Sequence, residues 1–221
     1  KRIGKGNADR RWDVLPQQPS LAYDLAQNRL IVTAAILQGP VFNAKADAAD
    51  KFGSFGGLVG HELTRAIDAK GALVDAKGEL RSWWTPADKT AWTLLGSRVA
   101  TQYGAYEFPG VKGAKVNGTL TQEENLADIA GLELAWAAYT AQEPKAKPAQ
   151  QQGFFRAWAA LWPQQLSPNE AARRLTADIR APGRWRTNGP LSNLPAFGAS
   201  FSCKPGQPMQ RTDAEQIKVW R

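Results

Sequence analysis

The sequence predicts a mainly helical α+β domain with one small strand element near its N-terminus. Helix-start signals support this fold class: a hydroxyl residue is followed three positions later by an acid at Thr85, Thr121 and Ser167. The 221 residues are 43% hydrophobic and 22% charged, which is ordinary for a globular chain. We expect residues 1–221 to form a single domain.

The first part of the chain is expected to lead into a central helix. Residues 1–19 are polar and contain Gly and Pro, so they predict an irregular lead-in. The short apolar run at 30–37 fits either a strand or a buried turn of helix, because periodicity alone does not separate the two. A Gly-rich stretch at 52–60 then opens a helix that should continue to Asp68.

The rest of the chain is expected to alternate helices with irregular segments. Helices are predicted over 85–106, from Thr121, over 154–162, over 167–178 and near Ala196. The Pro-, Lys- and Gln-rich segment 142–152 predicts an exposed linker. Pro and Gly residues between 182 and 195 are expected to break regular structure.

Composition narrows the classes of function. The formal charge of +8 comes from scattered basic residues without a nucleic-acid motif, so we expect no nucleic-acid partner. No apolar run approaches the roughly 20 residues of a membrane span. The single cysteine, Cys203, excludes an internal disulfide and a cysteine metal cluster. Because the chain begins at Lys1 rather than Met, we expect a processed or truncated piece with any targeting signal upstream.

The central helix carries the motif Gly60-His61-Glu62-Leu63-Thr64-Arg65. Residues four apart project from the same helix face, so the side chains at 61 and 65 should lie one above the other. In H-E-x-x-H, two imidazoles at this spacing bind zinc, and the Glu is the general base for the metal-bound water. Here the second imidazole is replaced by the guanidinium of Arg65.

Further motifs follow in order along the whole chain: Asp9-Arg10-Arg11-Trp12, Ala34-Ala35-Ile36-Leu37-Gln38, Arg81-Ser82-Trp83-Trp84-Thr85, Val116-Asn117-Gly118-Thr119-Leu120-Thr121, Glu124-Asn125-Leu126-Ala127-Asp128, Asn188-Gly189-Pro190-Leu191-Ser192-Asn193 and Phe201-Ser202-Cys203-Lys204-Pro205-Gly206. Together they resemble the catalytic half of the neprilysin family of zinc endopeptidases, which includes endothelin-converting enzymes and bacterial oligopeptidase O. The resemblance implies a thermolysin-like, helical zincin catalytic lobe. It also implies an extracytoplasmic location, periplasmic or secreted, and a large N-terminal helical domain that is absent from this piece.

The resemblance assigns a role to each matching residue. His61 and Glu124 fall on metal ligands, and Glu62 falls on the catalytic base. Asp128 corresponds to the acid that orients a ligand imidazole, and Asp68 to a further outer acid. From the residues alone, Glu124 also fits the closing acid of a capping box that starts at Thr121.

Three functional elements depart from the family pattern. Besides Arg65, the family's transition-state His in D-x-H-x-P-G is replaced by Arg180, while the following substrate-binding Arg is kept as Arg186. The family's substrate-binding N-A-x-Y is represented by the stretch that contains Ser20, Leu21 and Tyr23, and of its named residues only Tyr23 remains.

Arg65 does not suit a metal ligand, because a guanidinium keeps its proton and has no acceptor. At an effective dielectric of about 20, a divalent ion 4 Å away would be repelled by about 8 kcal/mol before screening. The same cation can neutralise Glu62 or Glu124, so we expect Arg65 to hydrogen-bond one of them in the metal's place. We expect no cofactor, and we expect Arg65→His alone to restore some zinc affinity.

Three interpretations of function stay open at this point. The first is a non-catalytic family member that binds a peptide or protein ligand. The second is an active zinc endopeptidase that hydrolyses oligopeptides with other ligands or a weak site. The third is a structural or interaction module, associated with the missing N-terminal domain or with another chain.

Overall fold

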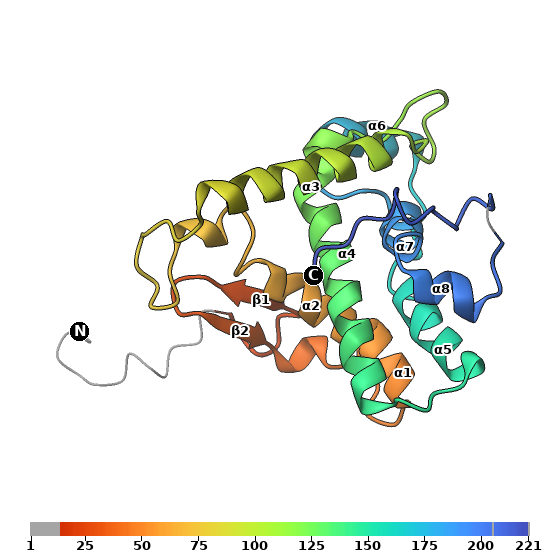
Figure 1. The fold of residues 1–221 in the computed structure, drawn as a ribbon, viewed down its shortest axis with the longest axis horizontal. Helices are drawn as coiled ribbons and strands as arrows, with labels where there is room; N and C mark the ends of the chain where they lie inside the picture. Colours follow the sequence, from red (N-terminus) through yellow and green to blue (C-terminus); the bar gives the residue numbers. More distant parts are fainter. Residues whose placement is uncertain (1–13, 205, 221) are drawn as a thin grey trace.

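Helix α4 (Gly118–Gln142) is the long helix against which α2 (Gly57–Thr64), α3 (Pro86–Gly104) and α7 (Gly183–Leu191) pack (Figure 1). The computed structural model describes residues 14–204 and 206–220. The expected lead-in over residues 1–13, with the Asp9–Trp12 motif, lies outside them. The described chain is mostly helical with one two-stranded sheet, which confirms the predicted fold class.

The sheet is an antiparallel hairpin of β1 (Leu21–Asp24) and β2 (Arg29–Val32), with Leu21 opposite Val32. The Asp24 carboxylate accepts the N–H groups of Ala26 and Gln27 and thereby stabilises the connecting turn. A 3₁₀ turn at Ala34–Ile36 follows. The apolar run at 30–37 therefore contains the end of a strand and then a helical turn, and β1 lies against α2.

The segment before the central motif is continuous helix. It runs from α1 (Ala48–Lys51) through a π-helical turn (Phe52–Gly56) into α2. Close approach requires glycine here, because a Cβ at Gly60 would lie 2.4 Å from the Gly131 carbonyl oxygen on α4. A 3₁₀ turn (Gly71–Leu73) follows α2, which ends at Thr64 with Arg65 as its C-cap.

Two predicted helix starts are confirmed and one is wrong. Thr85 caps α3 by accepting from the Asp88 N–H, and Ser167 caps α6 (Pro168–Ala177) by accepting from the Glu170 N–H. Helix α4, however, begins at Gly118 rather than after Thr121. Its N-cap is Asn117, whose side chain accepts from the Leu120 N–H, so Glu124 is an interior residue of the helix and not a capping acid.

Two segments expected to be irregular are helical. Most of the second half of the predicted linker belongs to α5 (Pro148–Ala159), because Pro148 occupies the first helical position and the Gln150 side chain accepts the Lys147 N–H. Helix α7 contains Pro190, which cannot donate to the carbonyl of Arg186. The Trp158 ring N–H binds that carbonyl instead, at 3.0 Å, and so satisfies the group that the proline leaves free. Helix α8 (Pro195–Ser200) is where it was expected.

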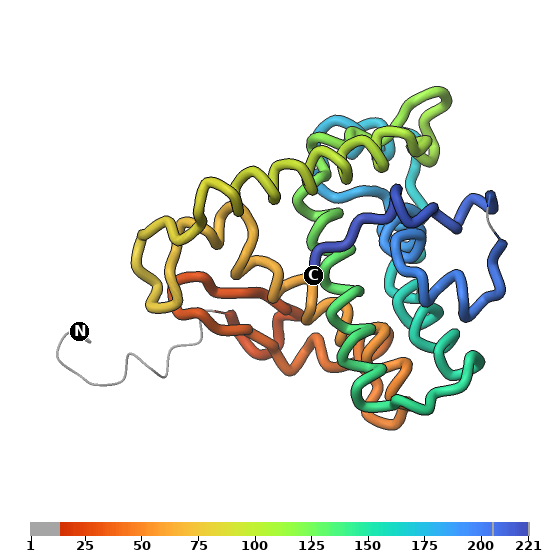
Figure 2. The backbone as a smooth tube through the Cα atoms, viewed as in Figure 1, coloured from red at the N-terminus to blue at the C-terminus, as the bar shows by residue number. Residues whose placement is uncertain are grey.

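Two apolar clusters lie along α4. One, toward α3, contains Val99, Tyr103, Leu126, Ile129 and Ile217. The other, toward α5, is largely aromatic and contains Leu132, Tyr139, Phe154, Phe155 and Trp158. The C-terminal segment crosses the middle of α4, where the Trp220 ring N–H binds the Ala130 carbonyl at 2.8 Å (Figure 2). Within residues 14–204 and 206–220, no helix is both long and apolar enough to cross a membrane.

Candidate functional site

The predicted metal and catalytic residues meet where α2, α4 and the start of α7 come together. Helix α2 contributes His61 and Glu62, and its C-cap contributes Arg65. Helix α4 contributes Glu124 and Asp128. Gly60 and Gly131 bring these helices together at the level of His61. A Cβ on Gly131 would lie only 2.2 Å from the backbone nitrogen of His61.

His61 and Asp128 form a buried pair. The His61 Nδ1 lies 2.7 Å from Asp128 Oδ1, and the Asp128 side chain has no exposed surface. Arg186 binds both oxygens of the same carboxylate, at 2.8 and 2.7 Å, and its guanidinium lies 3.7 Å from the centre of the Trp162 ring. Burial raises the pKa of Asp128, but Arg186 and His61 outweigh it and hold the pKa at about 2.

Arg65 lies among the other predicted ligands. Its NH2 atom hydrogen-bonds Glu124 Oε1 and lies 3.2 Å from His61 Nε2, while NH1 lies 3.4 Å from Asp68 Oδ2. Burial lowers the pKa of Arg65, but the Glu124, Asp68 and Glu62 carboxylates outweigh it and raise the pKa. The guanidinium is a permanent cation, and its hydrogen bond to Glu124 is the one expected from the sequence.

These contacts fix the hydrogen-bonding direction of His61. A guanidinium can only donate, so Nε2 accepts from Arg65. The ring proton therefore resides on Nδ1 and points to Asp128. A relay of hydrogen bonds runs from Arg65 through His61 to Asp128, which Arg186 holds from its other side.

Arg180 contacts the same Glu124 carboxylate. Its Nε lies 3.2 Å from Glu124 Oε2 and forms an ion pair with it. That oxygen is buried and has no hydrogen-bond donor among the described residues, because the Arg180 contact is close without hydrogen-bond alignment. Arg180, expected at the transition-state position, instead neutralises a predicted metal ligand.

Glu62 is tied to the hairpin. Its Oε2 accepts the backbone N–H of Tyr23 at 3.2 Å, and its Oε1 lies 4.0 Å from His61 Nε2. The Tyr23 hydroxyl points elsewhere and hydrogen-bonds Asn28. Ser20 lies next to Leu21 at the start of β1. Its N–H donates to the Thr33 hydroxyl, and its carbonyl accepts the Thr33 N–H. The hydrogen bond between the hairpin and the cluster thus comes from the backbone of Tyr23.

Arg186 was expected to bind substrate, but in the structure it holds the Asp128 carboxylate. Its guanidinium donates to both oxygens of Asp128, and only 12% of its side chain is exposed. Asp68 accepts the N–H groups of Lys70 and Gly71, each at 2.8 Å, in addition to its contact with Arg65. It therefore organises the turn after α2 as well as the outer edge of the site.

Zinc does not fit this arrangement. His61 Nε2 and Glu124 Oε2 lie 3.7 Å apart and could share one ion, but a catalytic zinc takes three protein ligands. The third position holds Arg65, whose donor atom contacts both remaining ligands. Among the described residues, no group of three or more His, Cys, Asp or Glu is arranged to hold a metal.

Sequence reasoning missed several residues that shape the site. Trp162 supports Arg186, Trp158 binds its carbonyl, and Gly131 lets α2 approach α4. A glycine such as Gly131, inside the helix predicted to follow Thr121, signals close packing, and this signal was available in the sequence. The two tryptophans gave none, because their positions depend on tertiary contacts.

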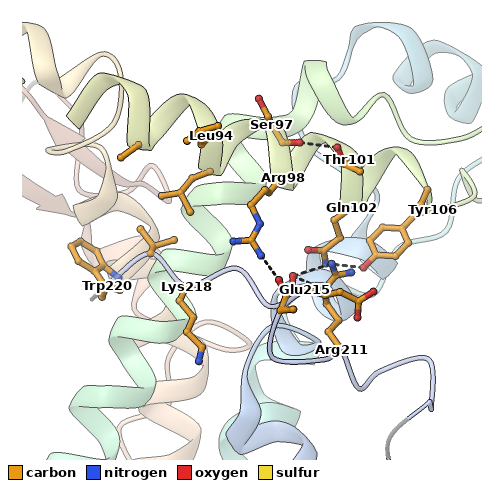
Figure 3. A pocket seen from close by; sticks show the side chains of 15 residues that line it. Leu94, Ser97, Arg98, Thr101, Gln102, Tyr106, Arg211, Glu215, Lys218 and Trp220 are labelled. Atoms are coloured by element: carbon orange, nitrogen blue, oxygen red, sulfur yellow. Dashed lines mark hydrogen bonds between the residues drawn. The ribbon is translucent and has the colours of Figure 1, made fainter. Parts of the chain in front are cut away.

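A separate cavity of about 1030 Å³ lies between α3 and the C-terminal segment (Figure 3). Leu94, Arg98 and Trp220 are among the residues around it. The predicted site residues do not line it. It is therefore distinct from the His61 and Glu124 cluster.

The fold is that of a zinc-peptidase domain, and within it Arg65 contacts both residues expected to be metal ligands, His61 and Glu124. The chain belongs to peptidase family M13, whose family model matches residues 22–217. It is 34% identical over 219 residues to endothelin-converting enzyme 1 of Bos taurus, covering 95% of this chain and 28% of that protein. It is 30% identical to neprilysin-3 of Drosophila melanogaster, covering 100% of this chain and 29% of that protein.

Solved structures agree with the sequence relatives. PepO from Lactobacillus rhamnosis has a TM-score of 0.84 and 34% identity, and the match covers 95% of this chain and 32% of PepO. The open state of the zinc metalloprotease Zmp1 of Mycobacterium tuberculosis has a TM-score of 0.89 and 30% identity, with 96% and 34% covered. The family is zinc-dependent. The chain spans about a third or less of the length of these relatives.

Proposed function

We propose that this domain keeps the M13 peptidase fold without its hydrolytic chemistry and binds a peptide or protein segment instead. The observation that carries the proposal is the position of Arg65, which bonds Glu124 and contacts His61 Nε2. A metal that entered would have to displace a cation held by two carboxylates and would then find two ligands. Loss of zinc removes both the activated water and the stabilisation of the oxyanion.

The other residues expected to take part in hydrolysis are also bound by neighbouring groups of the domain. Glu62 accepts a backbone N–H from β1, Arg180 pairs with Glu124, and Arg186 is bound to Asp128. Binding is proposed because the hairpin and the helices α2, α4 and α7 still pack together around this altered cluster. The partner is a peptide or protein, and the N-terminal portion that the longer relatives have is a second candidate partner. The family resemblance also supports a location outside the cytoplasm, which is part of this proposal.

The opposing candidate is an active zinc endopeptidase. Two observations favour it. His61 hydrogen-bonds Asp128, as the ligand imidazole of a zinc site would, and its Nε2 lies 3.7 Å from Glu124 Oε2, close enough for both to bind one ion. Such an enzyme would need Arg65 to swing out and another ligand to enter.

Elemental analysis and peptide assays separate these functions. We expect less than stoichiometric zinc after dialysis, an unchanged melting temperature with a chelator, and no cleavage of a mixed peptide library. Retention of library peptides without cleavage supports the binding role. Chelator-sensitive cleavage contradicts the proposal, and a protein that neither binds nor cleaves peptides is a structural module.

A further inference from the structure

The Glu124 carboxylate lies between two arginines that come from different parts of the chain. Arg65, at the end of α2, hydrogen-bonds Oε1, and Arg180, in the loop between α6 and α7, forms an ion pair with Oε2. Only 9% of the Glu124 side chain is exposed. A buried carboxylate needs a cation, and here each oxygen has its own.

The loop around Arg180 is well anchored. The Arg180 N–H binds the Asp178 carboxylate at 2.9 Å, and the following residues Ala181, Pro182 and Gly183 are buried. The position of the Arg180 backbone is therefore set by the fold, while 54% of its side chain is exposed. The side chain reaches Glu124 because that carboxylate offers an otherwise unbonded oxygen.

We infer that Arg180 is a second residue that determines metal exclusion, coupled to Arg65 through Glu124. Oε2 is the Glu124 oxygen that lies 3.7 Å from His61 Nε2, so it is the one that a shared ion would use. Arg180 contacts this oxygen, whereas Arg65 hydrogen-bonds the other one. This inference rests on the proposed metal-free function and names the second residue that maintains it.

Arg180 should limit the zinc affinity that Arg65→His alone can restore. That substitution supplies an imidazole but leaves a cation on Oε2, which repels a divalent ion at short range. Removing Arg180 alone leaves the Arg65 guanidinium between the two ligands. Each substitution alone should therefore bind zinc weakly, and the pair should bind more tightly than the two separate effects predict.

The test compares zinc affinity in the wild type, Arg65→His, Arg180→Gln and the double variant, by competition with a chromophoric chelator. We expect the double variant to bind zinc at least about tenfold more tightly than Arg65→His. The matched control is Arg65→His with Arg184→Gln, because Arg184 lies over the Trp185 ring rather than on Glu124. The control should equal Arg65→His.

Each outcome is decisive. Equal zinc affinity in Arg65→His and the double variant overturns the role of Arg180 and leaves the proposed function intact. No zinc binding by the double variant also overturns it. Stoichiometric zinc in the wild type instead overturns the proposed function. If a variant is only marginally folded, the rise of its urea midpoint with added zinc reports the same affinities, because a ligand of the native state stabilises it.

Discussion

Arg65 places a permanent cation one helical turn after His61. Its charge is matched by Glu124 and Asp68, and only 21% of its side chain is exposed. The sequence predicted this hydrogen bond because three acids without a metal need a cation nearby. It could not predict the second cation, since the distance from Arg180 to Glu124 depends on how the α6–α7 loop packs.

The ion pair between Arg65 and Glu124 should contribute more to the free energy of unfolding than exposed ion pairs in the same chain. We expect Arg65→Met to lower the free energy of unfolding by about 2–4 kcal/mol, because it leaves Glu124 buried with only Arg180 as a counter-charge. Arg65→Met with Glu124→Gln should recover most of this loss. The control is Arg81→Met, whose side chain is 72% exposed beside Asp75 and should change stability by less than about 1 kcal/mol. Equal losses from Arg65→Met and Arg81→Met in urea unfolding would contradict this prediction.

Protonation of the Asp128 carboxylate should lower the free energy of unfolding in acid. Its folded pKa, about 2, lies below the ordinary value of 3.8, so its contribution is fully present above about pH 4 and is lost as the pH falls through 2. We expect a loss of about 2 kcal/mol in this window, measured by urea unfolding at several pH values. Asp128→Asn, although less stable throughout, should show a shallower loss. An equally steep loss in that variant would assign the acid sensitivity to other carboxylates.

At the scale of elements, local capping chemistry predicted α3 and α6 well. It misplaced the start of α4, where Asn117 rather than Thr121 is the cap, because both residues have suitable side chains and packing selects between them. It missed α7, since the proline within that helix predicts a break, and the carbonyl it leaves free is bound by a distant donor, Trp158. Such a donor cannot be identified from local sequence.

The contact between α2 and α4 should not tolerate a methyl group. Gly131→Ala places a Cβ 2.2 Å from the backbone nitrogen of His61. We therefore expect a loss of about 1–3 kcal/mol in unfolding free energy and a displaced His61. Gly104→Ala is the matched control, because nothing lies within 4 Å of its Cβ; stability there should hold or rise by up to about 1 kcal/mol. Thermal unfolding of both variants provides the comparison, and a neutral Gly131→Ala would show that the helices can separate freely.

At the scale of the whole molecule, side chains from several helices hold the C-terminal segment. Arg98 on α3 donates to the carbonyls of Ala214 and Gln216. Glu133 on α4 accepts the Val219 N–H at 2.9 Å. The segment thereby connects the two helices that flank one of the apolar clusters.

Asn193 is the residue through which this segment joins the core. It is 2% exposed; its side-chain nitrogen donates to Gln102 Oε1 and the Gly189 carbonyl, and its oxygen accepts the Ile217 N–H at 2.9 Å. We expect Asn193→Ala to lower the unfolding free energy by about 2–3 kcal/mol, because it leaves buried polar groups unsatisfied. The exposed Asn43 supplies the control, Asn43→Ala, which should change stability by less than about 0.5 kcal/mol.

Hydrogen exchange shows whether the C-terminal segment unfolds with the rest of the molecule. If it is part of the cooperative core, Asn193→Ala should speed exchange at Ile217 and Val219 and within α3 and α4 by similar factors, since all of them open through global unfolding. If exchange rises at 217–219 while α3 and α4 keep their protection, the segment is a separately opening flap and the loss of unfolding free energy should be small. The bonds from Asn193 to Gln102, Gly189 and Ile217 tie α3, α7 and the C-terminal segment together, so cooperative opening is the expected result.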